Sequence, residues 1–340
     1  MKHLHYAIVL FLGLAICFPV AAQDSGPVRI IFDTDIGNDV DDTLAMGVIH
    51  ALQNRGECKL LAVTITKDNK YAPPMINLIN TFYGRPNIPI GMVRGGVTPE
   101  DGAYLKQVVL TKNDKGGDAF PSSIEPGSMV PDAVTLLRKT LAAEKDGSVV
   151  VVQVGFSTNF ARLMDTGPDA ISPLSGMELI QKKVQLLSIM AGAFDPKYTH
   201  VEYNLACDLP AAKKLIAEWP TPIVFSGFEI GDLIYYPAVS MREDYNYVKQ
   251  HPLKEAYFYY RGGLESDQPT FDLTSVLYAV RPDRGYFDLT EPGTVVLDEK
   301  GYTSFKPDAN GKHRYMKVSA AQIARVREAL CLLSSEPPKK

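Results

Sequence analysis

The residues of this chain that could carry chemistry begin with an aspartate-rich segment near the N-terminus. Residues 33–42 read Asp-Thr-Asp-Ile-Gly-Asn-Asp-Val-Asp-Asp, so five carboxylates fall within ten residues. Such like charges repel one another unless a cation lies between them. Their oxygen atoms suit Ca²⁺ or Mg²⁺ far better than Zn²⁺, which prefers His or Cys. The pattern therefore indicates a metal site, and the alternative is an acidic loop whose aspartates cap a helix.

The segments on either side of these aspartates favour the metal site. Residues 28–32 are apolar and rich in Val and Ile, as in a strand that is buried on both faces. One face of a helix is predicted after the aspartates by Leu44, Ala45, Val48, Ile49 and Leu52. A strand followed by a helix places the aspartates at the carboxyl edge of a sheet, where open α/β folds bind ligands. The helix dipole would also stabilise Asp41 and Asp42.

The same alternation of short apolar runs and helical patterns continues along the chain. The further predicted strands are residues 59–65, 88–93, 149–154, 184–190 and 223–225. A helical face is predicted within residues 133–141, after Pro131. Strands that alternate with helices predict an α/β fold with a mostly parallel open sheet, covered by helices on both faces.

Two segments interrupt this alternation. Residues 95–128 are rich in Gly, Pro, Asp and Ser, which predicts a long surface excursion. Residues 285–317 contain turn residues and short alternating runs, which predict hairpins. A closing amphipathic helix is then indicated by Ile323, Val326, Leu330 and Leu333. No segment is typical of an interdomain linker, so residues 23–340 are predicted to form one domain.

The first 22 residues have the features of a secretory signal peptide. Lys2 precedes an apolar run over residues 6–16, and Val20-Ala21-Ala22 offers small residues for cleavage after Ala22. The run is shorter than the about 20 apolar residues that a membrane span needs. We therefore expect an exported protein, periplasmic or secreted, with no membrane span.

The overall composition is that of a folded globular protein. Apolar residues make up 46% of the 340 residues and charged residues 22%. Lys and Arg number 35 against 39 Asp and Glu, so no broad basic field is available for nucleic acid. Nucleic acid is therefore not the expected partner. Four cysteines in this length also exclude a disulfide scaffold.

Five blocks, in order along the chain, resemble the inosine-uridine preferring nucleoside hydrolases. The first is formed by Asp33, Asp35 and the pair Asp41-Asp42. Its turn is two residues longer than in the best-known members, which leaves the role of Asp39 open. The other four blocks are residues 62–66 with Asp68-Asn69, residues 156–161, residues 190–194 with Glu202-Tyr203-Asn204, and Phe271-Asp272-Leu273.

This resemblance implies a nucleoside hydrolase-like fold and a calcium-dependent hydrolysis of the N-glycosidic bond of ribonucleosides. It implies that Asp35, Asp42, Asp272 and the backbone carbonyl of Thr158 ligate Ca²⁺, with Asp35 also the general base. It implies that Asp41, Asn69, Glu202 and Asn204 bind the ribose hydroxyls. Carboxylates suit this reaction because its transition state resembles an oxocarbenium ion. The resemblance further implies a homodimer or homotetramer.

One departure from the family pattern affects the expected mechanism. Phe271 stands where well-known members carry a histidine that protonates the leaving base, and a phenyl ring cannot donate a proton. His200, with a pKa usually near neutrality, is the candidate replacement. Its alternative is an ordinary surface histidine.

Two other functions are considered. An exported calcium-dependent ribosyl-binding protein, or a hydrolase of a non-nucleoside riboside, would keep the same site. A phosphatase of the haloacid dehalogenase type is suggested by Asp33-x-Asp35, but Gly37 and Asn38 replace the continuation that this class carries.

Overall fold

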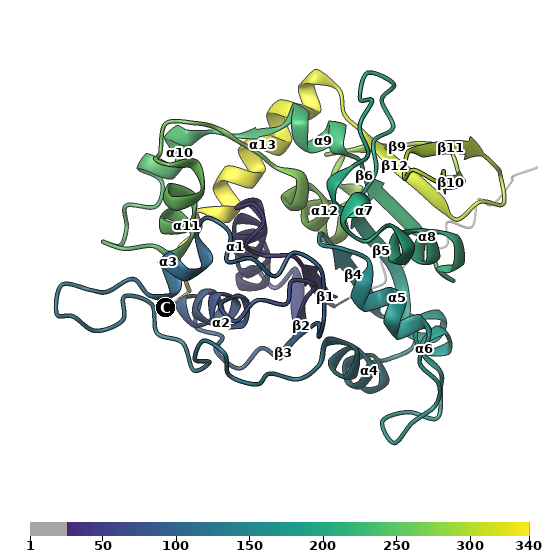
Figure 1. Cartoon of the computed structure of the whole chain (residues 1–340). Helices are drawn as coiled ribbons and strands as arrows, with labels where there is room; N and C mark the ends of the chain where they lie inside the picture. The colour runs from purple at the N-terminus through teal and green to yellow at the C-terminus, as the bar shows by residue number, and fades with distance from the viewer. Residues whose placement is uncertain (1–25, 340) are drawn as a thin grey trace, which may run out of the picture.

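The computed structural model describes residues 26–339, and the predicted signal peptide over residues 1–22 lies outside the described residues. The described chain forms a ten-stranded sheet in the order β11-β10-β12-β6-β5-β4-β1-β2-β3, with β9 beside β12 (Figure 1). The main strands are β1 Val28–Thr34, β2 Cys58–Ile65, β3 Ile90–Met92, β4 Val149–Gln153, β5 Val184–Met190 and β6 Ile223–Ser226. These six strands pair in parallel, which confirms the predicted α/β fold.

Helices cover both faces of this sheet because successive strand residues point to opposite faces. In β1, Ile30 and Phe32 join one apolar core, whereas Ile31 joins the other. The first core is covered by α1 Asp41–Asn54, α2 Ala72–Phe82, α11 Pro252–Arg261, α12 Phe271–Val280 and α13 Ala320–Ser334. The second is covered by α4 Ala133–Ala143, α5 Thr158–Met164, α6 Gly176–Lys183 and α8 Leu209–Glu218.

The strand order reverses direction between β1 and β4. From β1 the chain crosses to β2 and β3 on one side, while β4, β5 and β6 follow on the other. This is the place in an open sheet where a crevice forms at the carboxyl ends of the strands. Gly155 lies just after β4, and a Cβ there would lie 2.5 Å from Thr66 Oγ1 and 2.6 Å from the amide nitrogen of Asp35. The absence of a side chain lets the two strand ends approach closely.

The C-terminal region extends the same sheet. The strands are β9 Asp288–Leu289, β10 Gly293–Leu297, β11 Thr303–Pro307 and β12 His313–Lys317. β10 and β11 form the predicted hairpin, whereas β12 lies between β10 and β6 and pairs in parallel with β6. The helix α13 closes the chain, with Val326, Leu330 and Leu333 buried as predicted.

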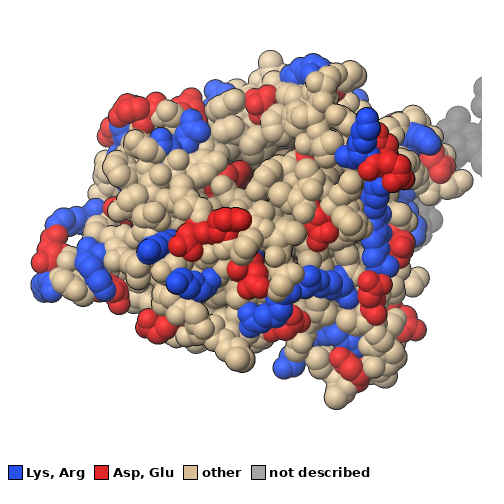
Figure 2. All heavy atoms as spheres, in the orientation of Figure 1, with Lys and Arg blue, Asp and Glu red and all other residues tan. Residues whose placement is uncertain are grey.

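The remaining elements are short. They are α3 Leu105–Val109, α7 Tyr203–Cys207, α9 Phe228–Leu233, α10 Ala238–Glu243, the 3-10 turn Pro282–Arg284, and the strand pair β7 Tyr235–Tyr236 and β8 Gln268–Pro269. None of the helices within residues 26–339 has the length and apolar character needed to cross a membrane. Figure 2 shows acidic and basic side chains interspersed over one face of the molecule.

Candidate active site

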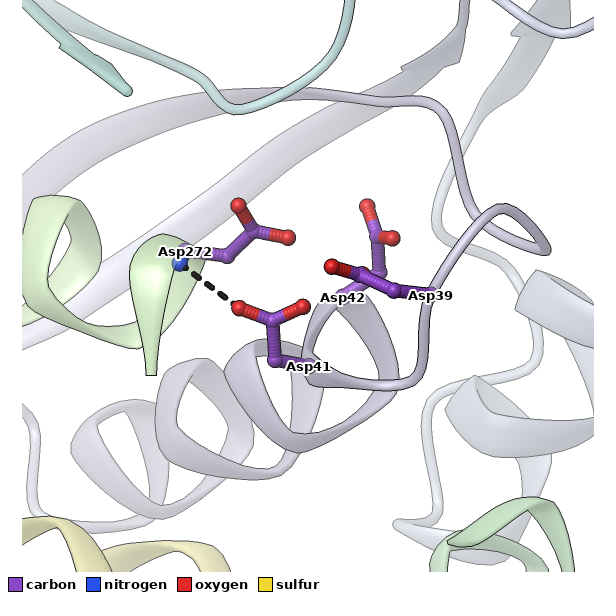
Figure 3. Close-up of side chains that lie close together, drawn as sticks. All are labelled: Asp39, Asp41, Asp42 and Asp272. Carbon is purple, nitrogen blue, oxygen red and sulfur yellow. Dashed lines mark hydrogen bonds between the residues drawn. The ribbon is translucent and has the colours of Figure 1, made fainter. Parts of the chain in front are cut away.

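Four aspartates form a compact cluster at the carboxyl edge of the sheet. Asp39, Asp41, Asp42 and Asp272 each contribute one carboxylate oxygen, and these oxygens all lie within 4.8 Å of one another (Figure 3). Asp41 and Asp42 lie in the first turn of α1, and Asp272 lies in the first turn of α12. Two helix N-termini therefore meet at the cluster, and their positive ends partly offset its negative charge.

Hydrogen bonds satisfy only one of the two carboxylate oxygens of Asp41, and the same is true of Asp42. The backbone N–H of Asp272 donates to Asp41 Oδ2 at 3.0 Å, and the hydroxyl of Thr34 donates to Asp42 Oδ1. Asp41 Oδ1 and Asp42 Oδ2 are buried without a hydrogen-bond partner. An unpaired buried carboxylate oxygen is costly, and a bound cation would remove that cost. The donor set consists of oxygens alone, so the cluster can hold a hard metal ion.

Burial and mutual repulsion raise the pKa of each carboxyl group in the cluster. Burial raises the pKa of Asp41 to about 6. The pKa of Asp42 is raised well above its usual range by burial and then by the charges of Asp35 and Asp39. Burial and the charge of Asp41 do the same for Asp272. Four ionised groups at this spacing therefore need a positive charge among them.

Asp35 lies beside the cluster and is held by the turn that follows β1. Asn38 Nδ2 donates to Asp35 Oδ2 at 2.7 Å, and Lys67 Nζ donates to Asn38 Oδ1 at 2.7 Å. Lys67 is 1% exposed, so its ammonium is an internal cation next to the acidic cluster. Burial, followed by the charge of Asp39, raises the pKa of Asp35 to about 7. A carboxyl group with this pKa can exchange a proton near neutral pH.

A cleft of about 270 Å³ opens beside the cluster, and its lining is part polar and part aromatic. Its polar lining residues are Asp35, Asn38, Asp39, Glu202, Asn204 and Asp272. Glu202 caps α7, because its carboxylate accepts from the N–H groups of Asn204 and Leu205. Asn204 Nδ2 donates to the carbonyls of Val154 at 2.8 Å and Met190 at 3.2 Å, which ties the ends of β4 and β5 together. Burial raises the pKa of Glu202 to about 7.

The aromatic lining residues of the cleft are Tyr203, Phe228, Tyr260 and Phe271. The rings of Phe228 and Phe271 are 5.0 Å apart with an interplanar angle of 30°. Gly231 makes room for them, since a Cβ there would lie 2.3 Å from Phe271 Cδ1. Flat apolar rings of this kind suit a planar aromatic ligand.

Five residues singled out from the sequence do not line this cleft: Asp41 and Asp42, which lie in the cluster, and Asn69, Thr158 and His200. Asn69 Nδ2 donates to the carbonyl of Pro99 and to Asp101. The hydroxyl of Thr158 donates to Asp208 at 2.5 Å. His200 is exposed and packs edge-on against the lining residue Phe228, with 4.6 Å between the ring centroids. Their proposed roles stay predictions.

Several residues that line the cleft or lie beside the cluster were not given a role from the sequence. Asn38 and Asp39 lie in the turn after β1. The extra length of this turn relative to the family pattern was the signal that could have drawn attention to them. Tyr260 belongs to an aromatic run, residues 257–260, that by itself does not distinguish core from site. Lys67 follows a strand like many surface lysines, and only its contacts show that it is buried.

Comparison with known proteins places this site in a family. The model of the inosine-uridine preferring nucleoside hydrolases matches residues 30–326. The chain belongs to this family. The cluster, Asp35 and the cleft all lie within the matched residues, and the resemblance inferred from the sequence is thereby confirmed. Family membership supports N-glycosyl hydrolysis of nucleosides in general.

Solved nucleoside hydrolases share the fold at low sequence identity. A plant nucleoside hydrolase aligns over 92% of this chain and 100% of its own, with a TM-score of 0.66 and 20% identity. A purine-preferring ribonucleoside hydrolase from Gardnerella vaginalis aligns over 90% and 99%, with a TM-score of 0.66 and 16% identity. Among relatives by sequence, an uncharacterized protein of Schizosaccharomyces pombe is 24% identical over 277 residues, which is 75% of this chain and 81% of the relative.

Proposed function

We propose that this protein hydrolyses the N-glycosidic bond of ribonucleosides in a calcium-dependent reaction that releases ribose and the free base. The observation that carries the proposal is one cleft whose lining combines two kinds of side chain. Its carboxylates and amides suit a polyhydroxyl sugar, and its aromatic rings suit a planar nucleobase.

The metal site would be built from the chain's own oxygens. Asp42 and Asp272 belong to the cluster of carboxylates. The family resemblance implies these two as ligands, together with Asp35 and the backbone carbonyl of Thr158. The chemistry that Ca²⁺ supplies when bound is orientation of the ribose hydroxyls and acidification of the attacking water.

Asp35 is the proposed general base. Its Oδ2 accepts from Asn38, which leaves Oδ1 to take a proton from water as the water oxygen bonds to C1′. The bond between C1′ and the nucleobase nitrogen breaks. Its electron pair leaves with the nucleobase, which receives a proton. Glu202 and Asn204 would bind ribose hydroxyls, joined by Asp41 and Asn69 in the family-based assignment. The nearby carboxylates also stabilise positive charge on the sugar.

Protonation of the leaving base is the step that this cleft supports least. Among the described lining residues none is a histidine, and Phe271 occupies the predicted position of the acid. His200 stays the proposed acid; it contacts the lining residue Phe228 but does not itself line the cleft. This observation favours a second candidate function, an exported calcium-dependent ribosyl-binding protein or a hydrolase of a riboside with a better leaving group.

Export and assembly are part of the proposal. The apolar N-terminal run and the small residues ending at Ala22 support export. The family resemblance supports a homodimer or homotetramer.

Ribose release from mixed purine and pyrimidine nucleosides tests the proposal. Incubation with Ca²⁺ should release ribose, and prolonged chelator treatment should abolish the release. The matched 2′-deoxyribonucleosides should react far more slowly, because a site built to bond a hydroxyl rejects its absence. Full turnover after chelation would contradict the calcium dependence. Tight binding of ribosides without any ribose release would favour the binding protein.

A further inference from the structure

We propose that the preferred substrate is a riboside whose leaving group is a positively charged aromatic ring, as in an N-ribosylpyridinium cation. This inference rests on the proposed function, because it names the class of riboside that the same cleft would cleave. Three properties of the described lining residues lead to it: the side chains that could give up a proton, the excess of carboxylates, and the aromatic rings.

The side chains that line the cleft are poorly suited to protonate a leaving nucleobase. None of the described lining residues is a histidine, a lysine or an arginine. Glu202 is assigned to ribose hydroxyls, and both of its carboxylate oxygens already accept backbone N–H groups. Burial raises the pKa of Tyr203 and Tyr260, so each phenol is a weaker acid than an ordinary tyrosine. A leaving group that needs no proton suits such a cleft.

The cleft region carries an excess of negative charge. The acidic residues that line the cleft or belong to the cluster are Asp35, Asp39, Asp41, Asp42, Glu202 and Asp272. The ammonium of Lys67 donates to Asn38 Oδ1 and to the carbonyl of Thr98. Even with one Ca²⁺ bound, the ionised carboxylates outnumber the positive charges of that ion and of Lys67 together. Such a field favours a cationic ligand over a neutral or anionic one.

The aromatic rings of the cleft provide a second attraction for a flat cation. Phe228 and Phe271 are half-buried, and their ring centroids lie 5.0 Å apart with an interplanar angle of 30°. Phe271 directly precedes Asp272 in α12, so a ring and a carboxylate come from adjacent residues. The face of a phenyl ring attracts a cation through its quadrupole. A positively charged aromatic ring is therefore attracted by both kinds of lining side chain.

Hydrolysis of such a riboside balances without a general acid. Asp35 takes a proton from water as the water oxygen bonds to C1′. The bond between C1′ and the ring nitrogen breaks, and its electron pair stays on that nitrogen and cancels the positive charge. The heterocycle leaves as a neutral molecule, and the proton on Asp35 passes to solvent. Phe271, which cannot donate a proton, is no disadvantage in this reaction.

Ribose release by the full chain in the presence of Ca²⁺ tests the inference, with nicotinamide riboside as the cationic substrate and inosine as the neutral one. The kcat/KM should be at least about tenfold higher for nicotinamide riboside, because only inosine needs the missing acid. Benzamide riboside has the same shape but neither the charge nor the scissile nitrogen. Its inhibition constant should be at least about fivefold above the KM of nicotinamide riboside, because it lacks the attraction between a cation and the rings.

A variant of the aromatic lining separates the effect of charge from that of shape. Phe228→Leu should raise the KM for nicotinamide riboside about threefold or more and that for inosine by less, because leucine keeps apolar contact but has no quadrupole. Phe258→Leu is the control, since it removes an exposed ring that does not line the cleft, and both KM values should stay unchanged. If Phe228→Leu does not fold, Tyr203→Leu replaces it with the same expectation, because Tyr203 is an exposed lining residue.

The outcomes distinguish this inference from the proposed function. A higher kcat/KM for inosine, a benzamide riboside that binds as tightly as nicotinamide riboside, or equal KM increases for both substrates in the lining variant would overturn the inference alone. Release of ribose from neither substrate would overturn the proposed hydrolysis as well.

Discussion

Phe271 is the residue at which the cleft departs most from ordinary nucleoside hydrolysis. It precedes Asp272 in the first turn of α12 and lines the cleft. The position therefore borders both the acidic cluster and the expected site of the nucleobase. A proton donor placed here would face the leaving group without any change to the carboxylates.

We predict that Phe271→His increases kcat for purine nucleosides. General acid catalysis contributes about 10²–10⁴-fold, and a histidine that is imperfectly placed should still give about tenfold. The measurement is ribose release from inosine and, in parallel, from an activated aryl riboside whose leaving group needs no proton.

Phe271→Asn is the matched control, since it also replaces the phenyl ring with a smaller polar group but cannot act as an acid at neutral pH. Its kcat should not rise. If Phe271→His gains no more than Phe271→Asn on inosine, position 271 does not face the leaving group.

The elements that position the site depend on a close approach of two strand ends. The carboxyl ends of β1 and β4 meet at Gly155, where a Cβ would lie 2.6 Å from the amide nitrogen of Asp35. The pairing of these strands thus sets the position of the proposed general base through backbone contact.

Gly155→Ala should lower the free energy of unfolding by about 1–3 kcal/mol, because the added methyl group overpacks the strand ends. It should also lower kcat, since relief of the clash moves Asp35. Urea unfolding monitored by circular dichroism measures the first effect.

Gly167→Ala serves as the control, because a Cβ at Gly167 meets no atom within 4 Å. Its free energy of unfolding should stay within about 0.5 kcal/mol of the wild type. A Gly155→Ala protein with unchanged stability would show that the strand ends can separate freely.

At the scale of the whole molecule, buried charge makes stability depend on pH and calcium together. Burial raises the pKa of Asp33 and Asp35 to about 7 and that of Asp41 to about 6. A raised folded-state pKa means that ionisation favours the unfolded chain. Without metal, these groups therefore reduce stability as the pH rises from about 4 through 7.

Buried histidines act in the opposite direction. Burial lowers the pKa of His50 and His251 to about 3, so their contribution to stability is lost as the pH falls below about 6.5. His50 lies well away from the cluster, where it stacks on Tyr83 and bonds to Asn80. Subtracting the stability measured in chelator from that measured in calcium at the same pH therefore cancels the histidine contribution.

We predict that the increase in melting temperature on adding Ca²⁺ grows from about pH 5 to about pH 8, because the metal competes with protons for the carboxylates. Differential scanning calorimetry in matched buffers measures it. A calcium effect that is the same at both pH values would mean that the cluster aspartates are not the ligands.

The sequence determined the alternation of buried strands and helices, because that pattern depends on local side-chain polarity. The strands predicted at residues 28–32 and 184–190 correspond to β1 and β5, and the aspartates fall at the end of β1 as expected. The order of the blocks also identified the family. The motif residues Asp35, Glu202, Asn204 and Asp272 come together in the cleft.

The tertiary structure decided the contacts between residues that are far apart in the chain. The hydrogen bond from Asp272 to Asp41 spans 231 residues, and no local pattern encodes such a pairing. The insertion of β12 beside β6, the commitment of Asn69 to Pro99 and the burial of Lys67 are of the same kind. Each depends on where a distant segment packs, and the burial that follows shifts the pKa values on which the proposed chemistry rests.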